Sequence, residues 1–146
     1  MKIIFLDIDG VLNDDTTPPY PKDWPEGHLK EDLIARINQI VEATGAKIVM
    51  STAWRTVLSL KEFQELLGSK GLRAEIIDCT PSRMSFRPRW HEIKEWILDN
   101  REIYVESWVA IDDLLIKEAG ERLVRTNPSI GITDEDVEKA IKILLQ

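Results

Sequence analysis

Aspartates and a serine follow short apolar runs at three places in this sequence. Asp7 and Asp9 come after the run at 3–6, Ser51 comes after 47–50, and Asp112-Asp113 come after 107–111. Runs of this kind are typical of strands buried on both faces of a parallel sheet. Ligands bind outside the carboxyl ends of such strands, so we expect four carboxylates and a hydroxyl along one sheet edge. Taken alone, the first pair also fits an acidic turn, and the last pair a helix N-cap.

Four neighbouring carboxylates would repel one another unless a positive group lies among them. Carboxylate oxygens, water and a substrate phosphate are the ligands that Mg²⁺ prefers in proteins. The two histidines, His28 and His91, follow no metal-ligand spacing, and we interpret both as loop or surface residues. The sequence therefore predicts a Mg²⁺ site made of aspartates.

Predicted strands and helices alternate along the whole chain. The strands cover residues 3–6, 47–50, 72–78, 107–111 and 123–124, and the helices cover 29–44, 57–67, 90–100 and a last helix capped by Thr133. This alternation predicts the α/β class, with a doubly wound (Rossmann-like) five-stranded parallel sheet in the order 3-2-1-4-5 and helices on both faces. No repeat or boundary interrupts it, so residues 1–146 are predicted to form a single domain.

Two irregular segments separate these elements. Residues 14–28 contain four prolines and show no periodicity, which predicts a long loop that could serve as a lid. Residues 79–89 carry Arg83, Arg87 and Arg89 and no glutamate or aspartate. Arginine groups of this kind suit a phosphate-rich ligand.

Composition limits the classes of function. The net charge of −7 and the pI near 4.9 argue against a broad nucleic-acid-binding surface, which is normally basic, although they leave room for a local basic pocket. The single cysteine, Cys79, excludes an internal disulfide and suits a reducing compartment. Without a long apolar stretch or a signal-like N-terminus, we expect a cytoplasmic protein that does not contact membranes. An oligomer is compatible with the sequence, but no pattern predicts one.

Four stretches together resemble the four motifs of the haloacid dehalogenase-like (HAD) phosphohydrolase superfamily. These are DIDGVLN at 7–13, the serine after KIVM, a basic residue ahead of a helix, and AIDD at 110–113. The STAWR and IDD variants are most similar to small phosphatases without a cap domain. Those include the phosphatase domains of polynucleotide kinase-phosphatases and the HAD domains linked to RNA-repair proteins. The resemblance implies an open site at the sheet edge, unless the loop at 14–28 or a second subunit closes it.

The resemblance also implies a role for each aspartate. Asp7 would attack phosphorus and form an aspartyl-phosphate. Asp9 would protonate the leaving oxygen and then deprotonate the water that hydrolyses the intermediate. Asp112 and Asp113 would hold Mg²⁺ together with Asp7 and the backbone carbonyl of Ile8, and we also place Asp9 in the metal group.

Other positions are expected to bind the phosphate or the rest of the substrate. Ser51 would donate a hydrogen bond to a phosphoryl oxygen, and Gly10 and Thr52 lie next to the predicted catalytic positions. The family also places a cation at or just before the helix that precedes the fourth strand.

Arg89 fits this cation position better by spacing than Arg87, while Lys94 falls inside the predicted helix. We expect the other of the two arginines, together with Arg83, to bind substrate. Arg55 either faces the site or forms a surface ion pair.

Five tryptophans raise the possibility of stacking on bases. Trp96 and Trp108 have the spacing of core residues, and we assign them to packing. Trp54 and Trp90 adjoin the predicted site loops, so that contact with substrate and a structural role both stay open.

These features predict a Mg²⁺-dependent phosphomonoester hydrolase. We expect its substrate to be a nucleic-acid end phosphate or a nucleotide. A phosphatase of a small phosphorylated metabolite is the alternative that the acidic charge favours. A catalytically silent HAD-fold binding module is a third reading, against which the presence of both Asp7 and Asp9 argues, since a binder needs no acid at position 9.

Overall fold

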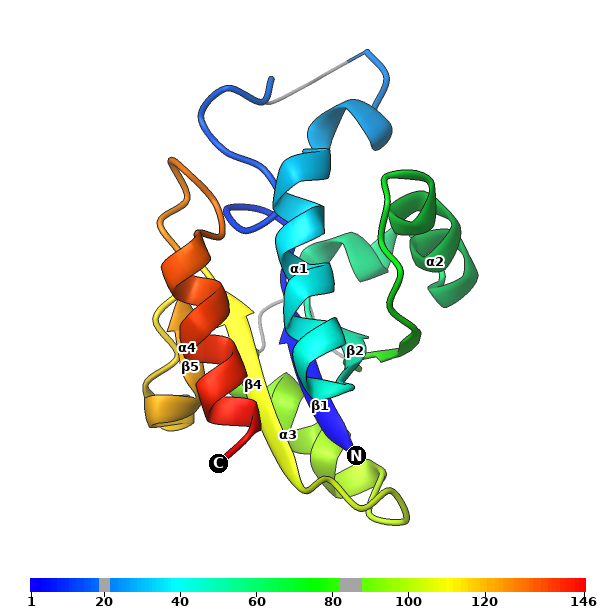
Figure 1. The fold of residues 1–146 in the computed structure, drawn as a ribbon. Helices are drawn as coiled ribbons and strands as arrows, with labels where there is room; N and C mark the ends of the chain where they lie inside the picture. The colour runs from blue at the N-terminus through cyan, green and yellow to red at the C-terminus, as the bar shows by residue number, and fades with distance from the viewer. Residues whose placement is uncertain (19–21, 82–87) are drawn as a thin grey trace.

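The computed structural model describes residues 1–18, 22–81 and 88–146 and places one parallel sheet at the centre of the molecule (Figure 1). Its five strands lie in the order β3-β2-β1-β4-β5, which confirms the predicted topology. The strands are β1 (Lys2–Leu6), β2 (Lys47–Met50), β3 (Ile76–Cys79), β4 (Ser107–Asp112) and β5 (Leu123–Arg125). Because β1 lies in the middle, residues just after it meet those just after β2 and β4.

Helices cover both faces of this sheet, as predicted. Alternate side chains of β1 point to opposite faces, so that Ile4 and Leu6 join one core cluster and Ile3 and Phe5 join the other. On the first face lie α1 (Glu31–Thr44), α2 (Leu60–Ser69) and α4 (Asp134–Leu144), with α1 and α4 side by side in Figure 1. On the second face lie α3 (Arg89–Asp99) and the short helix η3 (Lys117–Arg122).

Capping boxes explain where two of the helices begin. The Ser59 hydroxyl accepts a hydrogen bond from the amide of Glu62, whose carboxylate accepts one from the Ser59 amide. Thr133 and Asp136 form the same arrangement ahead of α4, which confirms the predicted cap. The helix expected over 57–67 therefore begins later, at Leu60, and continues through Gly68 to Ser69.

The third strand is shorter than predicted. It spans Ile76–Cys79 instead of 72–78, and its pairing with β2 shifts register between Ile48 and Val49. Residues 72–75 instead form the approach to the strand. Within it, the Arg73 amide donates a hydrogen bond to the buried side chain of Asn38 on α1.

The segment between β1 and α1 has little regular structure. Among its described residues, only Glu26–His28 form a helix, the short η1, so no folded cap is inserted there. Its two ends are tied together, because the Lys30 amide donates to the Leu12 carbonyl and the Lys30 ammonium lies 2.8 Å from an Asp14 carboxylate oxygen. In the part of the chain that the structure describes, no helix is both long and apolar enough to cross a bilayer.

Candidate active site

Three of the predicted aspartates meet where β1 and β4 end. The two strands run parallel with Leu6 opposite Ile111, so Asp7 lies beside Asp112, and Asp113 follows in the chain. One oxygen from each of the three carboxylates lies within 4.8 Å of the others. Asp7 and Asp112 are buried and Asp113 is half-buried. This group has the oxygen-only chemistry that a hard divalent cation requires.

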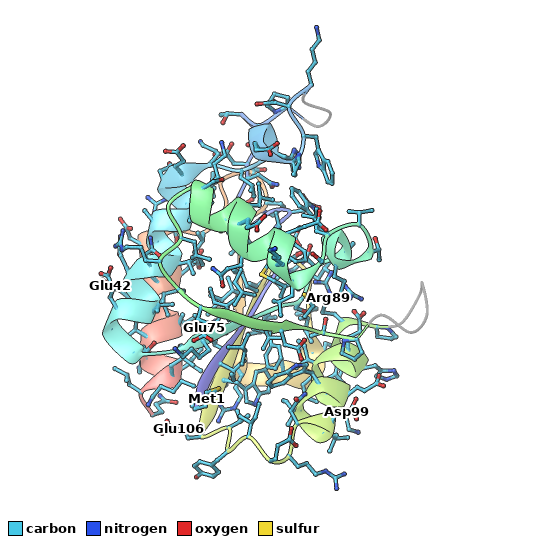
Figure 2. The ribbon with its side chains drawn as sticks, turned by 90° about the vertical axis from the view of Figure 1, so that its right-hand side faces the viewer. Met1, Glu42, Glu75, Arg89, Asp99 and Glu106 are labelled. Atoms are coloured by element: carbon cyan, nitrogen blue, oxygen red, sulfur yellow. The ribbon has the colours of Figure 1, made fainter. Side chains whose placement is uncertain are left out.

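Arg89 is the cation that the structure places among these acids. It is the first residue of α3, and Figure 2 shows it on the side of the molecule away from Met1, where β1 begins. Its guanidinium lies 3.1 Å from a carboxylate oxygen of Asp112 and 3.6 Å from one of Asp7, and it also donates to the Ser51 carbonyl. The spacing argument that favoured Arg89 therefore led to a residue that contacts the site.

One guanidinium does not balance this much negative charge. Burial, followed by the charge of Asp112, raises the pKa of Asp7 from 3.8 to about 8, although Arg89 acts in the opposite direction. Burial also raises the pKa of Asp112. Both shifts come chiefly from burial, and a divalent cation held by Asp7, Asp112 and Asp113 would stabilise the charged carboxylates, so it fits the residues present.

A second buried ion pair, between Arg55 and Glu92, lies next to Arg89. Arg55 and Glu92 form a salt bridge, with only 9% of the Arg55 side chain and 5% of the Glu92 side chain exposed. A Glu92 oxygen also lies 4.0 Å from Nε of Arg89, one turn earlier on α3. Arg55 donates in addition to the Thr52 carbonyl. Of the two alternatives for Arg55, facing the site or forming a surface ion pair, the structure shows an ion pair that is buried, and Glu92 links this arginine to Arg89.

The two hydroxyl residues after β2 differ in how they are used. The Ser51 hydroxyl is buried and has no hydrogen-bond partner among the described residues, which leaves it available to a phosphoryl oxygen. The Thr52 hydroxyl accepts a hydrogen bond from the Trp54 amide and thereby caps a short helix, η2 (Ala53–Thr56). The structure therefore gives Thr52 a local structural contact, where the sequence predicted a substrate contact.

Asp9 lies outside the acidic group, in contrast to the prediction that it belongs to the metal site. Its side chain is 57% exposed and is held by three neighbours. Oδ1 accepts a hydrogen bond from Asn13 Nδ2 at 3.1 Å and lies 3.1 Å from His28 Nε2, and Oδ2 accepts one from the Trp54 indole at 3.0 Å. These contacts hold the Asp9 carboxylate as a group separate from the acidic group of Asp7, Asp112 and Asp113.

His28 is a site residue that the sequence did not reveal. Its Nδ1 lies 3.0 Å from the Pro18 carbonyl oxygen, and its Nε2 lies 3.1 Å from Asp9 Oδ1. His28 therefore contacts the carboxylate that is predicted to be the general acid.

Two backbone groups in the turn after β1 are already engaged. The Ile8 carbonyl, predicted to bind Mg²⁺, accepts hydrogen bonds from the amides of Val11 and Leu12 and so is unsuited to that role. The Gly10 amide, expected to contact substrate, donates to Asn13 Oδ1 at 2.8 Å. Gly10 has φ +79, and a Cβ there would lie 2.6 Å from an Asp113 oxygen. Its role is to let the turn pass close to the acidic group.

The remaining predicted residues fall into three groups. Arg83 and Arg87 lie outside the described residues. Lys94 is exposed on α3, as expected for a solvated side chain. Burial raises the pKa of the Cys79 thiol to about 11, which keeps it protonated and makes it a poor nucleophile.

Three tryptophans pack against the core on the second face of the sheet. Trp96 is buried, and Trp90 and Trp108 are half-buried beside it, with 6.0 Å between the ring centroids of Trp90 and Trp108. The structural assignment holds for Trp96 and Trp108, and it extends to Trp90. Trp54, in contrast, donates to Asp9 and belongs to the site.

Comparison with known proteins agrees with this arrangement. A family model described as the HAD domain in Swiss Army Knife RNA repair proteins matches residues 3–137, a span that includes β4 and every residue of the site. No curated protein and no solved structure matches the chain. The chain therefore belongs to the family of HAD domains found in Swiss Army Knife RNA repair proteins.

Proposed function

We propose that this protein is a Mg²⁺-dependent phosphomonoester hydrolase that works through an aspartyl-phosphate intermediate. The observation that carries the proposal is the convergence of Asp7, Asp112 and Asp113 within 4.8 Å, with the Arg89 guanidinium beside them and the unpaired Ser51 hydroxyl at the same edge. The family match supports a phosphatase-type enzyme in general.

In the first step, a carboxylate oxygen of Asp7 attacks phosphorus while the bond to the leaving oxygen breaks. Asp9 acts as the general acid and donates a proton to that leaving oxygen, which departs as an alcohol. Arg89 and the Ser51 hydroxyl face the oxygens of the transferring group and stabilise their charge. A bound Mg²⁺ would neutralise part of the charge between the Asp7 carboxylate and the phosphate dianion.

In the second step, water attacks the phosphorus of the aspartyl-phosphate. Asp9 takes the proton from this water, and the bond between phosphorus and the Asp7 oxygen breaks, which releases inorganic phosphate and restores both carboxyls. The hydrogen bonds from Asn13 and Trp54 hold Asp9 in one orientation through both steps. A residue that must give and then accept a proton benefits from such fixed geometry.

The first experiment is hydrolysis of p-nitrophenyl phosphate with Mg²⁺. Asp7→Asn should abolish the activity, and an Asp7→Asn protein with full activity would overturn the proposal. Asp9→Asn should slow turnover by about a hundredfold or more while Mg²⁺ still binds, because the Asp9 carboxylate lies apart from the acidic group. Unchanged Mg²⁺ affinity in both Asp112→Ala and Asp113→Ala would refute the metal assignment.

For the substrate, we propose a phosphate at a nucleic-acid end or on a nucleotide. The absence of a folded cap among the described residues between β1 and α1 leaves space for a bulky leaving group, and the family name refers to RNA repair proteins. A small phosphorylated metabolite is the second candidate, favoured by the net charge of −7. A panel of 3′- and 5′-phosphorylated oligonucleotides, nucleotides and sugar phosphates separates the two.

A further inference from the structure

Three aromatic side chains form a cluster beside Asp9. Trp54 lies at its centre, with its ring centroid 5.1 Å from that of Trp24 and 5.7 Å from that of His28. Trp54 is 6% exposed, whereas Trp24 is 44% exposed. The cluster joins two parts of the chain, because Trp24 and His28 belong to the segment between β1 and α1, while Trp54 follows β2.

The polar atoms of the two inner rings are both directed at the Asp9 carboxylate. The Trp54 indole donates to Oδ2, and His28 Nε2 contacts Oδ1. If Asp9 protonates the leaving oxygen, as proposed above, the leaving group must lie next to Asp9 and therefore next to this cluster. Trp54 is covered by its neighbours, so the ring that is open to a leaving group is Trp24.

On the basis of the proposed function, we propose that Trp24 is a specificity-determining residue that stacks on a nucleobase in the leaving group. The substrate class is then a nucleobase carried on a phosphorylated sugar. Trp24 packs against Trp54, the ring that donates a hydrogen bond to Asp9. An aliphatic leaving group has no ring to stack on Trp24, whereas every nucleobase has a π face that can stack on it. Trp24 would thus make the site select for a nucleobase in addition to the phosphate.

The charges around Trp24 limit how much nucleic acid can follow. Within two positions of Trp24 the sequence has two acids, Asp23 and Glu26, against one base, Lys22, and the Asp23 side chain packs against the backbone of Gly27. Carboxylates at this point repel a continuing phosphate backbone. We therefore infer that Trp24 contacts the terminal nucleotide alone, so a single phosphorylated nucleoside and the end of an oligonucleotide present the same chemistry to it.

The test compares three phosphomonoesters with the full chain and Mg²⁺. They are adenosine 3′-phosphate, a short oligonucleotide with a 3′-phosphate, and glycerol phosphate, which has no ring. Trp24→Leu should lower kcat/KM for the first two by about ten- to a hundredfold, mainly through KM, and should leave glycerol phosphate within about twofold of the wild type. Trp24→Phe should restore most of the loss, because phenylalanine keeps a π face.

Tyr104→Leu is the matched control, since Tyr104 is an 80% exposed aromatic residue near Met1, away from Asp9. An equal loss on all three substrates in Trp24→Leu would show a structural role and overturn the inference, as would no loss on any. A wild type that hydrolyses glycerol phosphate but neither nucleotide overturns the inference and leaves the phosphatase function standing. A wild type that hydrolyses none of the three overturns both. Where the inference holds, the ratio of kcat/KM for adenosine 3′-phosphate to that for the oligonucleotide shows whether the preferred substrate is a free nucleotide or an oligonucleotide end.

Discussion

Replacing Glu92 by glutamine measures how far the site depends on its buried ion pair. Glutamine keeps the size of the side chain and one acceptor oxygen, but the Arg55 guanidinium then becomes a buried charge without a counter-charge at its partner. Removing one partner of a buried pair costs about 3–5 kcal/mol. Because Arg55 also donates to the Thr52 carbonyl, we expect the lower end, about 3 kcal/mol.

The same substitution should slow the chemistry as well. Glu92 lies 4.0 Å from Nε of Arg89, so its negative charge helps to hold the guanidinium between Asp7 and Asp112. We expect kcat for p-nitrophenyl phosphate to fall about tenfold, since Arg89 would be less well positioned toward the charge on phosphorus. Urea denaturation gives the free energy of unfolding, and kinetics at least ten degrees or so below the melting temperature separate slower catalysis from unfolding.

Two further variants decide whether the pair is the cause. Glu65→Gln, at an exposed position on α2, should change stability by less than about 0.5 kcal/mol. The double variant Arg55→Met, Glu92→Leu should be more stable than Glu92→Gln, because it leaves no unpaired charge at these positions. The reasoning is refuted if Glu92→Gln unfolds within about 0.5 kcal/mol of the wild type, or if the double variant is no more stable than the single one.

Three other changes test separate parts of the molecule. In the folded protein without metal, burial raises the pKa of Asp7 to about 8, against 3.8 in the unfolded chain. Stability should therefore fall as the pH rises from about 4 to 8. Asp7→Asn should flatten this slope in thermal melts, and equal slopes in the two proteins would contradict the prediction. Gly10→Ala should lower the free energy of unfolding by about 1–2 kcal/mol, because the residue has a positive φ. The new Cβ should also displace Asp113 and weaken Mg²⁺ binding, measured by calorimetry, and an unchanged affinity would contradict the prediction. Asn38→Ala should cost about 2 kcal/mol in urea, because both its buried amide atoms bond the turn at 71–73, and an unchanged midpoint would show otherwise.

The acidic group could be predicted from the sequence for a simple geometric reason. Parallel strands bring their carboxyl ends to one edge, so that residues directly after two neighbouring apolar runs must meet. Asp7 and Asp112 met in this way, and Arg89 followed because the first turn of α3 faces the same edge. These residues sit on regular elements, whose positions follow from periodicity.

Contacts that depend on the path of an irregular segment could not be predicted in the same way. The path that brings His28 to Asp9 runs through a proline-rich stretch with no period, and nothing in its spacing marks the contact. A glutamate in the first turn of a helix usually interacts with the helix dipole from the surface, whereas Glu92 is buried, so its pairing with Arg55 could not be predicted. The Ile8 carbonyl was predicted to bind Mg²⁺, but it accepts hydrogen bonds from the amides of Val11 and Leu12 within the tight turn after β1.

The tied ends of the segment between β1 and α1 give it unusual freedom to change. A backbone hydrogen bond joins Leu12 and Lys30, the residues at its two ends, so the positions of the strands do not depend on the length of the chain between them. Closing a loop twice as long costs only about 0.6 kcal/mol more. This segment can therefore be lengthened, shortened or exchanged for a small folded module while Asp7, Asp112 and Asp113 keep their places, provided that the contact of His28 with Asp9 is kept. A single catalytic base could in this way be fitted to leaving groups of very different size, and the segment is the natural place to engineer that choice.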